Sequence, residues 1–256
     1  MTSYAVSDTG ALLGRSLKHI TRSADTIITT AITPIAMMLL FVYVFGGAIK
    51  GSTGGTNYVN YLLPGILLMA IASGIAYTAL RVFNDMQGGI FERFQSMPIA
   101  RTSVLWAHVL TSMVANAITV VIILGVGLLM GFRSSAGPLA WLGIAGILTL
   151  FTLALTWIAV AVGLTAKSVD GATGFSYPLI FLPFISSAFV PTATMPGPVR
   201  AFAEHQPVTS IVDTISALLA QRPVDGAALA SALGWSAGIL VVAYGAAMLA
   251  YRRRIR

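Results

Sequence analysis

The stretch IITTAITPIAMMLLFVYVFGGAI, residues 27–49, decides the fold class because it contains no charged side chain. At about 1.5 Å per residue, a helix of this length crosses a hydrocarbon core of about 30 Å. A Lys or Arg at the centre of a span would raise the free energy of membrane insertion by about 3 kcal/mol, and about six Leu-class residues would be needed to offset it. The absence of charge from this stretch is therefore informative. We therefore predict that residues 27–49 form a membrane-spanning helix, in which Pro34 introduces a kink.

The composition of the whole chain is typical of a polytopic membrane protein. Apolar residues make up 57% of it, charged residues only 9%, and the mean hydropathy is +0.86, whereas soluble domains carry about 25% charged residues. The chain has no cysteine, so neither a disulfide scaffold nor a thiolate metal site is available. The net charge of +7 comes from basic residues at the ends of apolar runs, which favours membrane topology over nucleic-acid binding.

Five more apolar runs follow, and we predict a span in each: residues 58–81, 104–131, 139–166, 171–190 and 227–251. The second span should be broken near its start by Pro64 and end at Arg81. Four glycines form two small-xxx-small pairs suited to close helix packing, namely Gly127 with Gly131 and Gly234 with Gly238. The predicted fold is an all-α membrane protein with one permease domain, residues 27–251.

The fifth span contains an unusual density of proline, with Pro178 and Pro183 inside it and Pro191 just beyond. Irregular backbone at membrane depth survives only where protein or water satisfies its polar groups, so this end should be packed inside a bundle or line a cavity. Residues 199–220 then read as two short outer helices, the second with an apolar stripe of Val208, Ile211, Ile215 and Leu218.

The two ends of the chain are basic. In residues 1–26, helical spacing separates a leucine-rich face from the basic residues Arg15, Lys18 and Arg22, which predicts an amphipathic helix on a membrane surface; a solvated helix is the alternative. Residues 252–256 form a basic tail. With six spans both termini share a side, and that side holds eleven of the 15 Lys and Arg residues. Both termini are therefore expected in the cytoplasm.

The connection between the second and third spans, residues 82–103, reads as a short amphipathic helix. Asp85 is expected to cap the start of this helix, and Pro98 is expected to end it. Gly88 and Gly89 are expected to make the backbone that leads into it more flexible. Four apolar side chains fall within an arc of about 120° at helical spacing, namely Ile90, Phe91, Phe94 and Met97. From these residues alone, a groove on a cytoplasmic partner and the lipid interface are equally good places for this face.

The sequence contains no motif for an energy source that would drive transport. The phosphate-binding pattern G-x-x-x-x-G-K-[ST] needs a Gly-Lys step, but the chain's three lysines follow Leu, Ile and Ala. An ion-coupled transporter usually places charged relay residues inside spans. No acidic residue falls inside a predicted span, and the connections hold Asp85, Glu92, Asp170, Glu204 and Asp213. No metal-site or hydrolase motif such as H-E-x-x-H or G-x-S-x-G occurs, so no catalytic residue and no metal ligand is assigned.

Three blocks carry a resemblance to a known family: LLPGILLMA at 62–70, NDMQGGIFERFQSMPIARTSVL at 84–105 and SSAFVPTATMPGPVRAFAEHQPVT at 186–209. In this order they resemble the bacterial ABC exporter permeases of the type 2 class, the daunorubicin-resistance permease group. The resemblance implies a six-helix membrane subunit of the bacterial cytoplasmic membrane. It also implies a second permease subunit, identical or different, and a separate ABC-type ATPase that binds ATP and Mg, while this chain holds no cofactor.

The resemblance also favours a docking role for the connection, as a coupling helix that contacts the ATPase. Its residues are Asp85, Gly89, Ile90, Phe91, Glu92, Arg93, Phe94, Met97, Pro98 and Arg101. The cargo implied is a hydrophobic or amphipathic drug, lipid or glycolipid taken from the membrane. Phe181, Phe184 and Phe189 in the proline-broken span are the candidates for cargo contact. An ion-coupled secondary transporter and a membrane assembly protein without transport activity are the alternative functions.

Overall fold

The computed structural model describes residues 24–46, 58–88 and 103–254. The described part contains long helices and short ones and no strand. Their bounds are α2 Ala24–Leu39, the π-helix η1 Leu40–Phe45, α4 Tyr58–Gln87, α6 Ser103–Leu129, α7 Pro138–Thr165, α8 Val169–Gly174, α9 Ser176–Phe181, the 3-10 turns η2 Leu182–Ile185 and η3 Thr192–Thr194, α10 Gly197–His205, α11 Pro207–Leu219 and α12 Gly226–Arg254.

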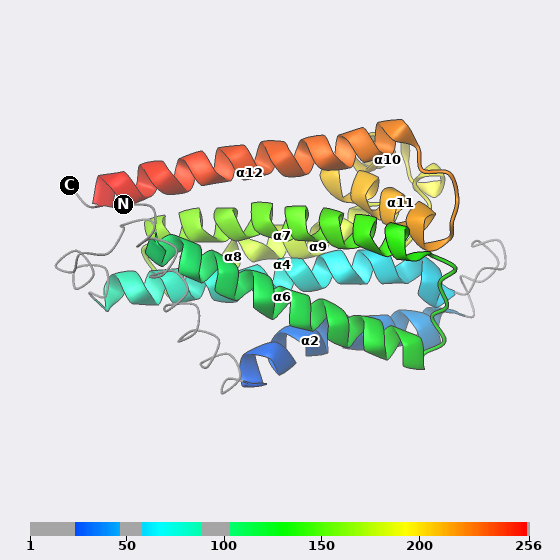
Figure 1. The fold of residues 1–256 in the computed structure, drawn as a ribbon, viewed down its shortest axis with the longest axis horizontal. Helices are drawn as coiled ribbons and strands as arrows, with labels where there is room; N and C mark the ends of the chain where they lie inside the picture. The colour runs from blue at the N-terminus through cyan, green and yellow to red at the C-terminus, as the bar shows by residue number, and fades with distance from the viewer. Residues whose placement is uncertain (1–23, 47–57, 89–102, 255–256) are drawn as a thin grey trace.

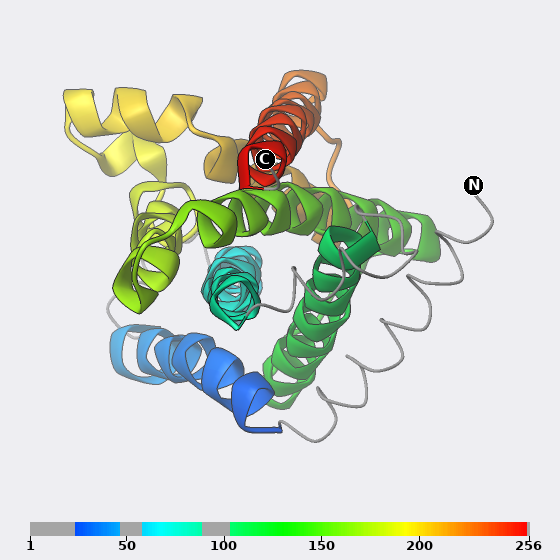
Figure 2. The ribbon, with the colours of Figure 1, turned by 90° about the vertical axis from the view of Figure 1, so that its left-hand side faces the viewer.

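Helix α4 lies at the centre of the molecule, and the other elements are arranged around it (Figures 1 and 2). It packs against α2, α6, α7, α8, α9 and α11, while α12 lies on the far side of α7 and packs against α7 and α11. Two thirds of the most apolar window of α4 is buried, compared with 17% of that of α12. The central position of α4 explains why apolar residues occupy nearly every side of its first half.

Four helices are long and apolar enough to cross a membrane: α4, α6, α7 and α12. They coincide with the predicted spans 58–81, 104–131, 139–166 and 227–251, except that α4 continues to Gln87. The other two predicted spans, 27–49 and 171–190, correspond to shorter apolar helices covering Thr30–Phe45 and Val169–Ile185. The prediction of an all-α membrane fold is confirmed for the described residues, and the count of six spans stays a prediction.

Two predictions about α4 were wrong. Pro64 does not break the helix, because α4 runs without interruption from Tyr58 to Gln87 with Pro64 inside it. The turn around Pro64 is fully buried, so packing on all sides offsets the one backbone hydrogen bond that proline cannot donate. Arg81 does not end the helix either, and Asp85 therefore lies inside α4 instead of capping a separate one.

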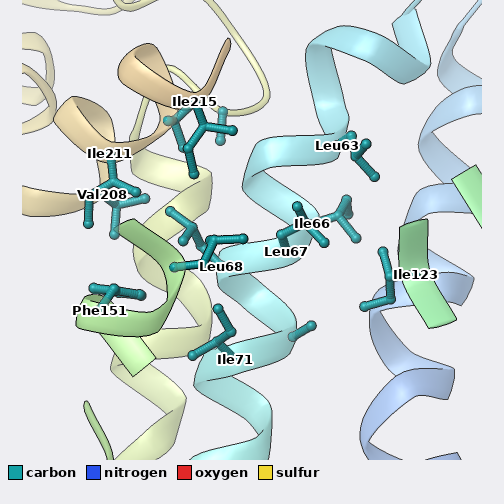
Figure 3. Packing of buried hydrophobic residues seen from close by; sticks show 14 of the residues in the cluster. Leu63, Ile66, Leu67, Leu68, Ile71, Ile123, Phe151, Val208, Ile211 and Ile215 are labelled. Carbon is teal, nitrogen blue, oxygen red and sulfur yellow. The ribbon is translucent and has the colours of Figure 1, made fainter. Parts of the chain in front are cut away.

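The predicted irregularity of the fifth span is confirmed. Residues 169–185 are divided into α8, α9 and η2 instead of forming one helix. Residues 199–220 do contain two helices, α10 and α11, although their place on the outer side stays a prediction. The apolar stripe of α11 points into the core: Val208, Ile211 and Ile215 are buried, and Leu218 is partly buried against them. Figure 3 shows this stripe facing Phe151 and the leucines and isoleucines of α4.

The ends of the helices form two separate groups (Figure 1). At one end of the molecule lie the end of α4, the start of α6, the end of α7 with the start of α8, and the end of α12. At the other end lie α10, α11 and the connection from α6 to α7. The first group carries Arg81, Lys167, Arg252 and Arg253, and the second carries Arg133, Arg200 and Arg222.

Candidate functional site

The predicted docking residues lie, with the exception of Asp85, in residues 89–102, outside the described part of the chain. Their role therefore stays a prediction. The structure does describe both residues that flank this segment, because Gly88 follows the end of α4 and Ser103 is the first residue of α6. Helices α4 and α6 pack against each other, so residues 89–102 connect two neighbouring helices.

A contact between Asp85 and His108 joins these two helices next to residues 89–102, called the docking segment below after its predicted role. Nε2 of His108 in α6 lies 3.0 Å from Oδ2 of Asp85 in α4. The side chain of His108 is 13% exposed and that of Asp85 is 32% exposed, so water screens the pair only in part. Sequence reasoning did not indicate that these two residues would meet, because no pattern along the chain determines how α4 and α6 are aligned.

A chain of hydroxyl groups continues from this end into the centre of the bundle. Oγ1 of Thr78 in α4 donates to Oγ of Ser112 in α6 at 2.8 Å, and Oγ of Ser112 lies 3.5 Å from Oγ1 of Thr156 in α7. All three side chains are buried. Buried hydroxyls that pair with one another fix the relative position of the helices that carry them, so α4, α6 and α7 are held in register here.

Arg81 lies beside the same chain of hydroxyls. Its Nη2 donates to Oγ1 of Thr78 at 3.4 Å, while its Nε has no hydrogen-bond partner among the described residues. Arg81, predicted to mark the end of a span, is thus part of the helix bundle.

Asn116, a buried polar side chain in α6, forms its hydrogen bonds within its own helix. Its Nδ2 donates to the carbonyl and the hydroxyl of Ser112 in its own helix, at 2.9 and 3.3 Å. It touches α4 by packing, because a Cβ atom added to Gly74 would collide with the Asn116 amide. The side chain of Asn116 and the backbone of α4 therefore fit together only because residue 74 is glycine.

The three phenylalanines predicted to contact cargo form one cluster at the other end of the molecule. The rings of Phe184 and Phe189 are stacked, with centroids 4.5 Å apart and planes at 7°, and Phe181 lies 6.0 Å from Phe184. Phe41 of the π-helix η1 joins them, 4.9 Å from Phe189. Phe189 is buried, Phe184 is partly buried and Phe181 is exposed, so the cluster extends from the core to the surface.

Sequence reasoning did not identify Phe41. The π-helix that contains it is a feature often found at functional sites, but it is visible only in the structure. Sequence reasoning also did not identify Gln206, which supports the irregular backbone of η2. Nε2 of Gln206 donates to the carbonyls of Ile185 and Leu182 at 2.7 and 3.3 Å. The prediction that protein groups would satisfy the broken span is thereby confirmed at these two carbonyls.

Asp213 is connected to the aromatic cluster through Ser187. Oγ of Ser187 donates to Oδ1 of Asp213 in α11 at 2.6 Å, and the hydroxyl of Tyr61 in α4 donates to the Ser187 carbonyl at 2.7 Å. Partial burial of its carboxyl raises the pKa of Asp213, while the Ser187 hydroxyl and the positive charge of Arg222 act in the opposite direction. Ser187, which lies between Phe184 and Phe189 in sequence, thus links the segment that carries these rings to Asp213 of α11.

These two sites suit different tasks. The end with Asp85 and His108 joins helices next to residues 89–102. The end with the aromatic cluster combines rings that extend from the core to the surface, an irregular backbone and a carboxylate. Neither arrangement brings a nucleophile, a base and an orienting group together as hydrolytic chemistry requires.

Comparison with known proteins identifies similar chains. The ABC-2 type transporter family matches residues 7–219. The daunorubicin resistance ABC transporter permease protein of Streptomyces coeruleorubidus is 30% identical over 209 residues, which cover 80% of this chain and 72% of the relative. A probable doxorubicin resistance ABC transporter permease protein of Mycobacterium tuberculosis (strain ATCC 25618 / H37Rv) is 26% identical over 251 residues, 97% and 89% of the two chains. Nodulation protein J of Bradyrhizobium diazoefficiens is 25% identical over 231 residues, 84% and 82% of the two chains.

Proposed function

Because the chain belongs to the ABC-2 type transporter family, we propose that it is the membrane permease subunit of an ATP-driven exporter for hydrophobic or amphipathic molecules. It is a multi-pass membrane protein with at least the apolar helices α4, α6, α7 and α12. The relatives named for daunorubicin and doxorubicin resistance support a drug-like cargo. A lipid or glycolipid remains within the same chemical class.

A separate ABC-type ATPase supplies the energy and binds ATP and Mg, and a second permease subunit, identical or related, completes the complex. The termini, the docking segment and the connection around Lys167 face the cytoplasm of a bacterial cell. Two observations support this orientation: eleven of the 15 basic residues belong to this side, and the described members of that set all lie at one end of the molecule (Figure 1).

The observation that carries the proposal is the connection between the docking segment and the centre of the bundle. The segment begins directly after α4, the helix at the centre of the molecule, and ends at α6. The Asp85–His108 contact and the Thr78–Ser112 hydrogen bond join these two helices within the turns nearest the segment. A force applied to residues 89–102 by an ATPase would therefore move α4 and α6 together, and through Thr156 it would reach α7.

The aromatic cluster lies where cargo would leave. Movement of α4 changes its contact with the broken span, because Gly65 of α4 packs so closely on Ala188 that an added Cβ would lie 2.5 Å from the Ala188 Cβ. Ala188 separates Ser187 from Phe189 in sequence. A shift of α4 would thus displace the segment that carries the Phe184–Phe189 stack. In this way ATP hydrolysis by the partner at the cytoplasmic end would open a path for cargo at the opposite end.

The test measures ATPase stimulation in proteoliposomes that contain the permease and its partner ATPase. We expect Phe91→Ala and Glu92→Lys to leave the permease inserted but to lower both stimulation and cargo export, because they remove an apolar anchor and a rim charge of the docking helix. Phe202→Ala is the matched control, since this exposed ring lies in α10 at the other end. Wild-type stimulation in both docking variants would refute the docking assignment.

A further inference from the structure

His108 is the only ionisable side chain in α6. The rest of this 27-residue helix, Ser103–Leu129, consists of apolar residues and residues with neutral hydroxyl or amide groups. An ionisable residue in a helix that crosses a membrane makes insertion less favourable and usually has a function. Histidine also differs from lysine and arginine, because its ring gains or loses a proton between about pH 5 and pH 8. The place of His108 in α6 therefore indicates a role that involves its charge.

Few charged groups face His108 from the elements that pack against α6, which are α2, α4 and α7. Helix α7 contains no ionisable side chain, and α2 contains only Asp25, in its first turn. The last three turns of α4 contain Tyr77, Arg81 and Asp85. Oδ2 of Asp85 lies 3.0 Å from Nε2 of His108. Arg81 acts on the Asp85 carboxylate electrostatically, but among the described residues these two form no ion pair.

Helix α12 ends at the same end of the molecule (Figure 1). Its Tyr251 is buried in the apolar cluster that also contains Leu105 and Val109 of α6, and Arg252 and Arg253 are exposed. Tyrosine and arginine side chains do not ordinarily change charge in the pH range in which histidine does. Among the described groups around His108, the Asp85 carboxylate is therefore the contact that responds when the ring changes its charge.

The strength of this contact depends on the charge of the ring. A carboxylate only accepts hydrogen bonds, so Nε2 of His108 donates to Oδ2 of Asp85. When Nδ1 also holds a proton, the hydrogen bond becomes charge-assisted, which makes it about twice as strong as a neutral one. The His108 side chain is 13% exposed and that of Asp85 is 32% exposed, so protons from the solvent reach the pair. The contact between α4 and α6 therefore strengthens as the pH falls.

We propose that Asp85 and His108 form a proton-controlled link between α4 and α6, which adjusts how efficiently ATP hydrolysis is converted into export. The link is tighter when the cytoplasm is acidic and looser when it is alkaline. It lies between the docking segment and the Thr78–Ser112 hydrogen bond, so it affects how far a movement of the segment reaches into the bundle. Both are positioning residues. This inference rests on the proposed function, because it describes the regulation of the contact that transmits force.

The experiment uses proteoliposomes that contain the permease and its ATPase, with the ATPase outside and the internal pH held constant. The probe is N-acetylpyrenebutylamine, a neutral amphiphile whose charge does not change with pH. The amount of probe transported per ATP hydrolysed is measured while the outer pH is lowered from about 8 to about 6, where histidine gains its proton. In the wild type we expect this ratio to rise about threefold, as a partly exposed hydrogen bond becomes charge-assisted.

The variants separate the charge of the ring from its presence. His108→Gln keeps a donor that cannot become charged, and Asp85→Asn removes the charge of the acceptor, so both should give a low ratio that does not change with pH. His108→Arg is always charged and should give a high ratio throughout. The matched control is His205→Gln in α10 at the other end, where Nδ1 of His205 contacts the Ala201 carbonyl at 2.8 Å. It should follow the wild type. A flat wild-type profile, or a profile in His108→Gln that rises like the wild type, would overturn the proposal.

A second measurement does not require transport. The melting temperature of the purified permease in detergent should exceed that of His108→Gln by a larger margin at about pH 6 than at about pH 8. The reason is that the charged contact stabilises the fold at low pH, and this contribution is lost as the pH rises. An equal margin at both pH values would also overturn the proposal. If the wild type transports no probe at any pH, the proposed function fails, and the melting temperatures then decide whether the link responds to protons.

Discussion

At the scale of single residues, three close contacts determine how tightly other segments approach α4. An added Cβ on Gly65 would meet Ala188, one on Gly74 would meet Asn116, and one on Gly163 of α7 would lie 2.6 Å from the carbonyl oxygen of Ala79. Small residues at such points let helix backbones approach each other, and packing of this kind replaces the hydrophobic effect as the driving force inside a membrane.

Gly163→Ala should destabilise the permease by about 1–3 kcal/mol, the usual cost of adding a methyl group to a tightly packed site. The new methyl would collide with the backbone of Ala79 and with Val82, at 2.6 and 2.8 Å, and backbone atoms move little. Gly146→Ala is the control, because it lies in the same helix with nothing within 4 Å. Thermal unfolding in detergent measures both, and equal melting temperatures would contradict the packing.

At the scale of secondary-structure elements, the proposed function assigns the pair of helices α4 and α6 to transmit force from residues 89–102. Two polar contacts join these helices: the Asp85–His108 pair near their ends and the Thr78–Ser112 hydrogen bond further into the bundle. Polar contacts between helices in a membrane are modest individually, about 0.6 kcal/mol on average. Their importance here lies in keeping the two helices in register when the segment between them moves.

A double-mutant cycle tests the outermost contact. Asp85→Asn and His108→Gln should each lower the ratio of cargo exported to ATP hydrolysed, and the double variant should lose little more than either single one, because both remove the same interaction. The coupling energy should be about 0.5–1 kcal/mol for a partly screened pair. The exposed pair Arg200–Glu204 serves as the control, and an additive double variant at Asp85 and His108 would argue against a direct contact.

The broken helix η2 depends on a side chain from another element. Gln206→Leu would leave the carbonyls of Ile185 and Leu182 without their side-chain donor, which should destabilise the permease by about 1–3 kcal/mol. Gln87→Leu, at the exposed end of α4, should have little effect. Unfolding in detergent compares the two variants, and similar stability would mean that other groups satisfy these carbonyls.

The elements differ in how well they could be predicted from the sequence. Long charge-free runs give α6, α7 and α12 almost to the residue, because length and hydropathy alone determine a span. Proline was informative in residues 169–185, where Pro178 and Pro183 lie five residues apart, but misleading at Pro64, where a single proline lies in a turn buried on all sides. The partners of Asp85, Asp213 and Phe41 could not be predicted, since they depend on how helices distant in sequence are aligned.

At the scale of the whole molecule, the distribution of buried and exposed apolar residues fits a bundle in a membrane. Large apolar side chains are exposed along α2, α6 and α12, where water would be a poor solvent but lipid is a good one. The predicted pair Gly234 and Gly238 has open space beside it, and α12 instead packs through its buried Ala232, Ser236, Ala243 and Ala247. The glycine face of α12 is therefore free for another subunit or for lipid.

The absence of cysteine from the sequence allows a direct test of orientation. Single cysteines introduced at exposed positions at the two ends, Ser135→Cys at one and Lys167→Cys at the other, should react differently with a membrane-impermeant maleimide. In intact cells we expect labelling at residue 135 only, and labelling at residue 167 only after the membrane is opened. The reverse pattern would place the docking segment outside the cell and contradict the orientation.

The central claim is that this permease moves cargo only when a separate ATPase drives it through the segment between α4 and α6. Cargo movement into sealed vesicles that contain the permease, with and without its partner ATPase, tests it most directly. We predict ATP-dependent accumulation only when both proteins are present, with no accumulation driven by a proton or sodium gradient. Accumulation by the permease alone under such a gradient would contradict the account.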